Sequence, residues 1–513
     1  MFEFDDDGIQ YECDKNVPEP EGINVESIKS DIYSISRTKR QHESADIWKN
    51  SKGKGTLNLI MRFGKTKVAK IIYDKCKEKN KDLKTIIIIP NNITRNNILT
   101  EFEKNDNTRI LSIFEFVNEY NNRVRFSCDL LILDEVHRFL SDSYISKLNS
   151  INCKFKLGLT GAKLSKDDIK YLKDLEIPII DSISEIEAIS NGWISPYIEY
   201  NLPVELRDSD KNSYAEYSKR ISDTVHLFNG MHISVNKVLK ADIFDTPFSL
   251  ALSCFTGKSY YNYPFIKPDV LRNIVASCAG WKKDMIIQND YDRKINQYWN
   301  PDNLYERCKL FKEYIKNRNE ILINNRNKID KVIEVIKYND VPTICFNEST
   351  KMVDVLVEYF HIDGIGYHSN IESRFVWDKT LNDIIRTKDG RPKKIGKTGL
   401  KNLAIKGMKD GTYKYLFTAK ALNEGLTIEN IEQVITTGGS TNPTTHDQRI
   451  ARGKTLDYSN PNKCCIIVNL YIDDFYINDI LVKSRDKQKL ILRQSKSEIE
   501  PIWINSIEEI EKS

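Results

Sequence analysis

Long apolar runs are absent from this sequence, and their absence limits where the protein works. The longest aliphatic run is Ile86–Ile89, and Pro90 ends it. A membrane-spanning helix needs about 20 apolar residues, so no membrane partner is expected. The first seven residues, MFEFDDD, lack the basic-then-apolar order of a secretory signal.

Paired cysteines and clustered histidines are also lacking. The ten cysteines include no C-x-x-C pair, and most lie in apolar stretches, as Cys128 and Cys345 do. This usage is typical of reduced thiols inside a cell. The seven histidines show no metal-ligand spacing, and a net charge of +4 is too small to indicate a nucleic-acid partner by itself. We expect an intracellular, cytoplasmic protein without a transition-metal site.

Two blocks of the chain alternate apolar strands with helical patterns, which predicts an α/β fold with parallel sheets. The candidate strands of the first block are Thr56–Met61, Thr85–Ile89, Ile110–Ile113, Leu130–Leu133 and Phe155–Leu159, with a helix over Lys67–Lys79. Those of the second block are Thr343–Phe346, Tyr415–Phe417, Gln433–Thr436 and Cys464–Leu470. Between the blocks, Leu304–Ile336 has the apolar spacing of one long amphipathic helix.

These patterns divide the chain into five predicted segments. An acidic N-terminal arm covers residues 1–26 and a first α/β lobe covers 27–200. A helical insert covers 201–335, a second α/β lobe covers 336–480, and a C-terminal tail covers 481–513. Aromatic residues of the insert (Tyr260, Tyr261, Tyr263, Phe265 and Trp281) either stack on bases or, as is more usual, belong to a core or an interface.

Two short motifs in the first block predict a nucleoside-triphosphate site. Gly64-Lys65-Thr66 follows one predicted strand, and Asp134-Glu135-Val136-His137 follows another. Backbone N–H groups at a helix N-terminus cradle phosphates, a lysine there reaches the β- and γ-phosphates, and a threonine hydroxyl ligates Mg²⁺. Asp134 is placed to hold the metal from the other side, and Glu135 to orient or deprotonate the attacking water. Both motifs follow strands, where a parallel sheet binds its ligands.

Further motifs follow in a fixed order. Gln41 precedes the GKT sequence, Leu159-Thr160-Gly161-Ala162 follows DEVH, and the second block contains Ala421–Thr427 and Gln448-Arg449-Ile450-Ala451-Arg452. The series resembles the superfamily 2 helicases and translocases, most closely the DNA helicases of phages and large viruses and the related XPB and UvsW-type enzymes. The resemblance spans residues 35–475, apart from the insert, and implies two RecA-like lobes with ATP and Mg²⁺ as cofactors.

The resemblance also implies a role for each matching residue. Gln41 would read the adenine edge, His137 would couple the site to nucleic-acid contacts, and Thr160 would relay between site and strand. Arg62 and Phe63 would border the phosphates with Gly64, Lys65 and Thr66, while Glu424 and Gly425 would face the cleft from the second lobe. Gln448 and Arg452 would complete the site, with Arg452 as an arginine finger on the γ-phosphate.

Several positions depart from the pattern of that family. Arg62 replaces a glycine in the phosphate loop, Leu59 replaces another, and Ala451 and Thr455 replace the last glycine and arginine of the second-lobe motif. Lys454 supplies a charge near the missing arginine but lacks a guanidinium fork. We predict an active but slow ATPase, and the alternative is a crippled one.

One loop of the second block is the most basic part of the chain. Its charged residues are Arg386, Lys388, Arg391, Lys393, Lys394 and Lys397, interrupted by glycine and proline. Such a loop either pairs with nucleic-acid phosphates or is a solvated surface loop. We predict an ATP-dependent helicase or translocase, on DNA rather than RNA, acting in viral or phage replication, recombination or transcription with proteins of those assemblies. The alternative is a nucleic-acid-binding structural subunit with a degenerate ATP site.

Overall fold

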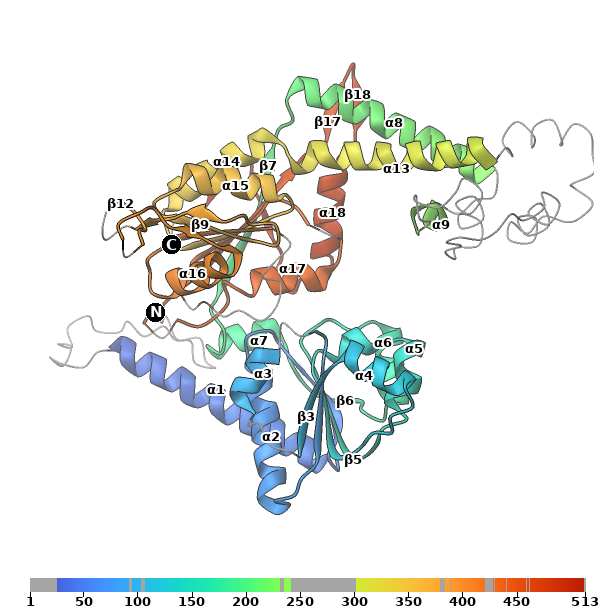
Figure 1. Cartoon of the computed structure of the whole chain (residues 1–513), viewed down its shortest axis with the longest axis vertical. Helices are drawn as coiled ribbons and strands as arrows, with labels where there is room; N and C mark the ends of the chain where they lie inside the picture. Colours follow the sequence, from blue (N-terminus) through green and yellow to red (C-terminus); the bar gives the residue numbers. More distant parts are fainter. Residues whose placement is uncertain are drawn as a thin grey trace, which may run out of the picture. The chain divides into compact units, whose positions relative to one another are not determined.

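The computed structural model describes residues 25–91, 95–102, 107–230, 235–240, 301–378, 383–387, 389–419, 428, 430–439, 441–457, 459–460 and 462–511. The described chain forms two compact units, one of residues 1–196 with 454–464 and the other of residues 197–453 with 465–513. Each unit contains one parallel sheet with helices around it (Figure 1), which confirms the predicted α/β class with two RecA-like sheets.

Unit 1 is built on six parallel strands in the order β3-β2-β4-β5-β1-β6. The strands are β1 Lys54–Leu59, β2 Thr85–Ile89, β3 Thr108–Ser112, β4 Ser127–Leu133, β5 Asn152–Thr160 and β6 Ile179–Ile183. The helices are α1 Val25–Asn50, α2 Lys65–Lys79, α3 Arg95–Glu101, α4 Ile113–Asn121, η1 Val136–Phe139, α5 Asp142–Leu148, α6 Lys166–Asp174 and α7 Glu185–Ser190. All five strands predicted for the first block are present, with ends shifted by a few residues.

Alternate residues of these strands enter two cores, because successive side chains of a strand point to opposite faces. Ile87 and Ile89 pack with α1, α2 and α7, whereas Ile86 and Ile88 pack with α4, α5 and α6. Both faces of the sheet are therefore buried, and only the strand ends remain open for chemistry.

Unit 2 is built on seven parallel strands in the order β19-β7-β16-β15-β8-β14-β9. These are β7 Tyr197–Val204, β8 Thr343–Asn347, β9 Gly364–His368, β14 Tyr415–Ala419, β15 Gln433–Thr436, β16 Cys465–Ile472 and β19 Ile502–Trp503. Its helices are α8 Asp208–Gly230, α9 Val235–Lys240, α13 Pro301–Ile323, α14 Arg326–Asn339, α15 Thr350–Tyr359, α16 Lys397–Lys409, α17 Pro443–Ile450, α18 Arg485–Gln494 and η3 Ile507–Glu509. Three antiparallel pairs complete it: β10 Arg374–Phe375 with β13 Lys394–Ile395, β11 Trp377–Asp378 with β12 Asp383–Ile384, and β17 Phe475–Ile477 with β18 Ile480–Val482.

Two segments outside the second predicted lobe contribute to the sheet of unit 2. Strand β7 crosses the predicted boundary at 200/201 and pairs along its length with β16. The predicted tail at 481–513 contains α18, whose Leu490 is fully buried, and β19, which pairs with β7.

The described part of the predicted insert is helical. Helices α8 and α13 run side by side (Figure 1), with Phe228 packed edge-on against Phe311 at 5.4 Å between ring centroids. The single helix predicted over 304–336 is wrong, because the chain breaks at Asn325, whose side chain accepts hydrogen bonds from the backbone N–H groups of Asn327 and Lys328 and starts α14. The insert's aromatic cluster and residues 1–24 lie outside the described residues. No helix among those described is long and apolar enough to cross a membrane.

Candidate nucleotide site

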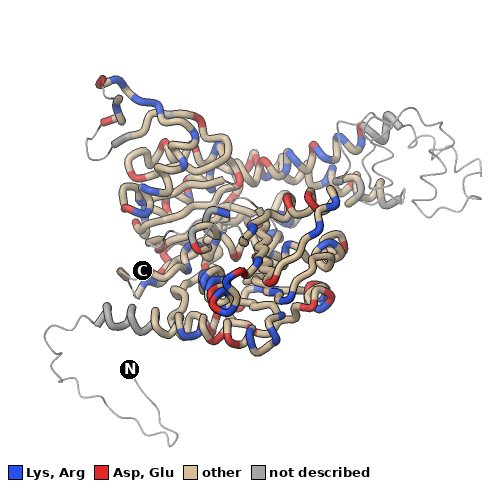
Figure 2. Tube along the Cα trace, turned by 60° about the horizontal axis from the view of Figure 1, so that its bottom comes forward, with Lys and Arg blue, Asp and Glu red and all other residues tan. Residues whose placement is uncertain are grey.

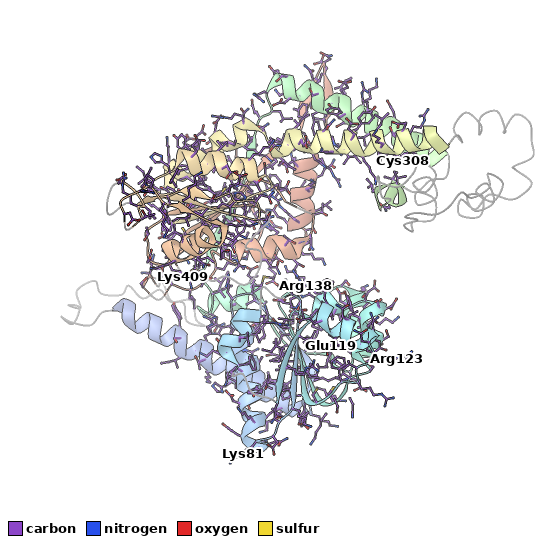
Figure 3. The ribbon with its side chains drawn as sticks, viewed as in Figure 1. Lys81, Glu119, Arg123, Arg138, Cys308 and Lys409 are labelled. Atoms are coloured by element: carbon purple, nitrogen blue, oxygen red, sulfur yellow. The ribbon has the colours of Figure 1, made fainter. Side chains whose placement is uncertain are left out.

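The predicted site residues of unit 1 gather at the carboxyl edge of its sheet. Strand β5 lies between β4 and β1, so the segments that follow these three strands are neighbours. In Figure 3, Arg138 of η1 marks this edge and Lys81, just past α2, marks the opposite one. The sheet order therefore brings together GKT, DEVH and Thr160, which are far apart in the sequence.

The loop from β1 to α2, predicted to bind phosphate, contains two residues at positive φ. Gly64 is the N-cap of α2 with φ 102°, and Arg62 adopts φ 72° without being glycine. Arg62 and Gly64 therefore both place the backbone in the left-handed region, with Phe63 between them. Burial and the nearby Arg37 lower the pKa of Arg62 to about 10, so it stays charged at neutral pH.

Helix α1 ties this loop down from outside. Gln41 donates from Nε2 to the Phe63 carbonyl at 2.8 Å, and Arg37 donates from Nε to the same oxygen at 2.9 Å. Arg37 also donates from Nη2 to the Arg62 carbonyl. The Oε1 atom of Gln41 is buried and has no hydrogen-bond partner in the described part of the chain. The Gln41 side chain thus holds the loop through Nε2, while its Oε1 atom can accept a hydrogen bond from a further donor.

Phe63 contributes only its backbone to the loop surface. Its ring is fully buried and packs edge-on against Trp193, with centroids 5.4 Å apart. Any contact of Phe63 with a nucleotide therefore comes from its main chain.

Lys65 and Glu135 meet across the edge of the sheet. The Lys65 Nζ atom lies 3.5 Å from Glu135 Oε1. A Cβ atom at Gly161 would lie 2.7 Å from the same Nζ, so the glycine after β5 leaves room for the lysine. Burial raises the pKa of the Glu135 carboxyl, but Lys65 and then His137 lower it, and the net pKa lies below the ordinary value. Glu135 is therefore ionised at neutral pH, and Asp134 beside it is 8 % exposed.

His137 links this pair to the end of β5. Its Nδ1 atom lies 3.4 Å from Glu135 Oε2 and 3.0 Å from Thr160 Oγ1. Thr160 Oγ1 in turn accepts from the Ala162 backbone N–H at 3.1 Å. Burial lowers the pKa of His137 more than Glu135 raises it, so the ring is neutral at pH 7. A continuous polar chain thus runs from Lys65 to Ala162.

The second-lobe motif lies in unit 2, on and just after α17. Gln448 and Arg452 are both buried, at 8 % and 6 % exposure, and Gly425 lies outside the described residues. Arg449 supports the helix by donating to the Gly438 carbonyl at 3.0 Å and by lying 5.6 Å from the centre of the Phe346 ring.

Lys454, which sits beside the position of the missing arginine, has a partner within unit 1. It forms a buried ion pair with Glu185 at the start of α7. The backbone of the same segment is held by Ser195, which donates to the Thr455 carbonyl at 3.0 Å. The sequence showed no sign of these partners, or of Arg37, because pairs so distant in the chain leave no local pattern.

The basic loop is partly used for its own structure. Arg386 pairs with Asp383 at 2.9 Å and donates to the Gly390 carbonyl at 3.0 Å. Lys394 lies 5.4 Å from the centre of the half-exposed Phe375 ring. Arg391, Lys393, Lys394 and Lys397 are exposed, and Lys388 lies outside the described residues. Elsewhere, basic and acidic residues are interspersed along the described chain (Figure 2).

Part of unit 2 is similar to a known protein family. Residues 396–454 match the family model described as the helicase conserved C-terminal domain. That stretch runs from α16 to just past α17 and contains Gln448 and Arg452. No curated protein matches the chain.

Two solved structures are similar over most of the chain. The Hef helicase domain of Pyrococcus furiosus is 13% identical, with 90% of this chain and 96% of that one covered and a TM-score of 0.44. Dbp5 of S. cerevisiae, bound to RNA and ADP BeF3, is 11% identical, with 94% of each chain covered and a TM-score of 0.46.

Proposed function

We propose that the protein is an ATP-dependent nucleic-acid helicase or translocase. The observation that carries this proposal is the polar chain Lys65–Glu135–His137–Thr160 at the carboxyl edge of unit 1, beside the loop from β1 to α2. Lys65 and Glu135 form an ion pair. A bound triphosphate would pair with Lys65 in place of Glu135, and the Glu135 carboxylate would then be available to orient a water molecule. DNA is the favoured substrate, in viral or phage replication, recombination or transcription within a host cytoplasm, with proteins of those assemblies as partners.

Each predicted site residue of unit 1 has a proposed role in ATP binding or hydrolysis. Lys65 and the N–H groups of the loop through Gly64 would bind phosphate oxygens, and Thr66 and Asp134 would hold Mg²⁺, which when bound would neutralise phosphate charge. Glu135 is ionised and orients the attacking water. The free Oε1 atom of Gln41 accepts from the adenine amino group, so the residue that fixes the loop also reads the base.

His137 and Thr160 are proposed to couple hydrolysis to nucleic-acid binding. The neutral imidazole contacts both the catalytic carboxylate and the threonine after β5. A shift of the loop after β5, caused by a bound strand, would change the hydrogen bond at Thr160 and thereby the position of Glu135. Buried polar contacts transmit such shifts because the low local dielectric makes a broken bond costly.

The proposed contribution of unit 2 is one arginine rather than two. Arg452 serves as the arginine finger, Gln448 and Gly425 border the nucleotide, and Thr455 supplies no charge. Lys454 does not replace the missing arginine, since its ammonium is committed to Glu185. An arginine finger accelerates phosphoryl transfer by about 10³–10⁵. Because the second arginine of the family motif is missing here, ATP turnover is expected to be slower than in a site that has both arginines.

The exposed part of the basic loop is the proposed nucleic-acid contact. Arg391, Lys393, Lys394 and Lys397, with Lys388, bind backbone phosphates without reading sequence. Arg386 belongs to the same surface but holds the loop through Asp383. The alternative, a structural subunit with a silent ATP site, predicts the same binding without turnover.

ATP turnover with and without nucleic acid tests the proposal. The wild type is expected to hydrolyse ATP faster with DNA present, and Lys65→Ala to lower kcat/KM about 100-fold or more. Lys67→Ala, an exposed lysine on the same helix, is the matched control and should leave the rate unchanged. Single-stranded, duplex and branched DNA, and RNA, are compared as stimulators. Equal rates for the wild type and Lys65→Ala would rule out the enzyme and leave the structural subunit.

A further inference from the structure

A buried polar cluster in unit 2 contacts, through His446, the helix that carries the second-lobe motif. The cluster is centred on the Glu199 carboxylate of β7, which is 1 % exposed. Its members come from elements that are widely separated in the sequence: Glu199 and Asn201 of β7, Thr436 of β15, His446 of α17, Asn469 of β16 and Gln494 of α18. None of its side chains belongs to the motifs that indicated the nucleotide site.

Three side chains donate to one oxygen of Glu199. His446 of α17 approaches Oε1 at 2.9 Å through Nε2, Asn469 of β16 donates to it at 2.7 Å, and Gln494 of α18 donates at 2.6 Å. Burial raises the pKa of Glu199, but His446 and the amide hydrogen bonds lower it to about 2, so the group is an anion throughout the physiological range. The Glu199 carboxylate therefore holds side chains from three elements: α17, β16 and α18.

The side-chain amide of Gln494 also binds Asn201, the second residue of β7 in the cluster. It exchanges two hydrogen bonds with Asn201, donating from Nε2 at 2.9 Å and accepting at Oε1 at 3.0 Å. Asn469 continues the network, since it donates to Asn201 at 3.1 Å and accepts from Thr436 at 2.6 Å. Helix α18, next to α17 in Figure 1, is thus bonded to the same strand residues that hold α17.

His446 stands two residues before Gln448 and six before Arg452 on or just after the same short helix. A helix of eight residues is too short to be stable by itself, so its orientation depends on tertiary contacts. We propose that Glu199, together with Gln494 of the C-terminal helix, is a positioning residue that sets the orientation of α17 and hence of Gln448 and Arg452 for ATP hydrolysis. The proposal rests on the function proposed above and assigns that site two residues from outside its motifs.

The main variant is Glu199→Gln. The glutamine oxygen can still accept from the three donors, and its NH₂ group replaces Oε2, which has no hydrogen-bond partner among the described residues. The change removes the charge with little change of volume. Gln494→Met is the second variant, since it removes the donor to Glu199 and both hydrogen bonds with Asn201 while filling a similar space. Leu356→Ala in α15, fully buried and outside the cluster, is the control for general destabilisation of unit 2.

DNA-stimulated ATP turnover is measured for the folded fraction of each protein. We expect Glu199→Gln to lower kcat at least tenfold with KM for ATP within twofold, because the nucleotide-binding loop lies in unit 1. Gln494→Met should lower kcat by a smaller factor, and Leu356→Ala should leave it unchanged at temperatures where it is folded. Equal losses for Glu199→Gln and Leu356→Ala, or a change of KM alone, would overturn the positioning role.

Hydrogen exchange of the backbone amides of residues 444–450 gives a readout that does not depend on turnover. In Glu199→Gln these amides should exchange at least tenfold faster than in Leu356→Ala under conditions of equal global stability. Unchanged exchange would overturn the inference even in an inactive protein. An inactive wild type in which Glu199→Gln does accelerate this exchange would refute the proposed ATPase while leaving the control of α17 by Glu199 intact.

Discussion

Replacing Glu199 with glutamine should destabilise unit 2 in a way that depends on pH. Glutamine resembles the protonated carboxyl, so the substitution removes the preference of the fold for the ionised form. The pKa of Glu199 is lowered from its ordinary 4.5 to about 2. At about 1.4 kcal/mol per pH unit, that difference corresponds to about 3 kcal/mol of unfolding free energy near neutral pH.

The sign of the pH effect follows from the direction of that change. A carboxyl whose pKa is lower in the folded state stabilises the fold above its unfolded pKa, and this contribution is lost as the pH falls toward the folded value. The gap between the wild type and Glu199→Gln should therefore be full near pH 7 and shrink to about 2 kcal/mol near pH 3.5.

Urea unfolding monitored at both pH values measures this gap. Glu334→Gln is the control, since Glu334 is a half-exposed partner of Lys331 on α14 and its loss should cost less than about 1 kcal/mol. A gap below about 1 kcal/mol near neutral pH, or one that widens on acidification, would refute the assignment of Glu199 as a buried anion stabilised by His446.

Three further outcomes are expected from the site and the basic loop. Gly64→Ala should abolish most ATP binding, because its Cβ would lie 2.6 Å from Gln41 Nε2 at a backbone φ of 102°; isothermal titration checks this, and wild-type affinity would contradict it. Thr160→Val, which removes the hydroxyl 3.0 Å from the histidine ring, should leave basal ATP turnover within about threefold while reducing its stimulation by DNA tenfold or more; a parallel loss of both rates would argue against coupling. Charge reversal of Lys393 and Lys394 should weaken DNA binding and reduce the slope of log K against log salt by about 0.9 for each phosphate that the loop no longer neutralises, and an unchanged slope would show that the loop is only a solvated surface.

The local features of the site were predictable from the sequence. Gly64-Lys65-Thr66 and Asp134-Glu135 each follow an apolar run, and in the structure they follow β1 and β4 as that pattern indicated. The strands of unit 1 are five to nine residues long. Apolar periodicity and flanking turn residues are enough to locate strands of this length in a sequence. Arg62 at positive φ was not predicted, since glycine is the residue expected there.

Long-range pairing was decided by the tertiary structure alone. Glu199 meets a histidine 247 residues away, and Lys454 meets Glu185 across 269 residues. Neither pair leaves a periodic signal, because the order in which strands enter a parallel sheet is set by crossover connections and packing rather than by the strands themselves. The triphosphate site was predictable because GKT and DEVH are short local motifs, each directly after an apolar run. That β7 and α18 belong to unit 2 and share the Glu199 carboxylate with His446 of α17 is visible only in the folded chain, because these contacts join residues hundreds of positions apart. The buried carboxylate is stable there because it accepts several hydrogen bonds.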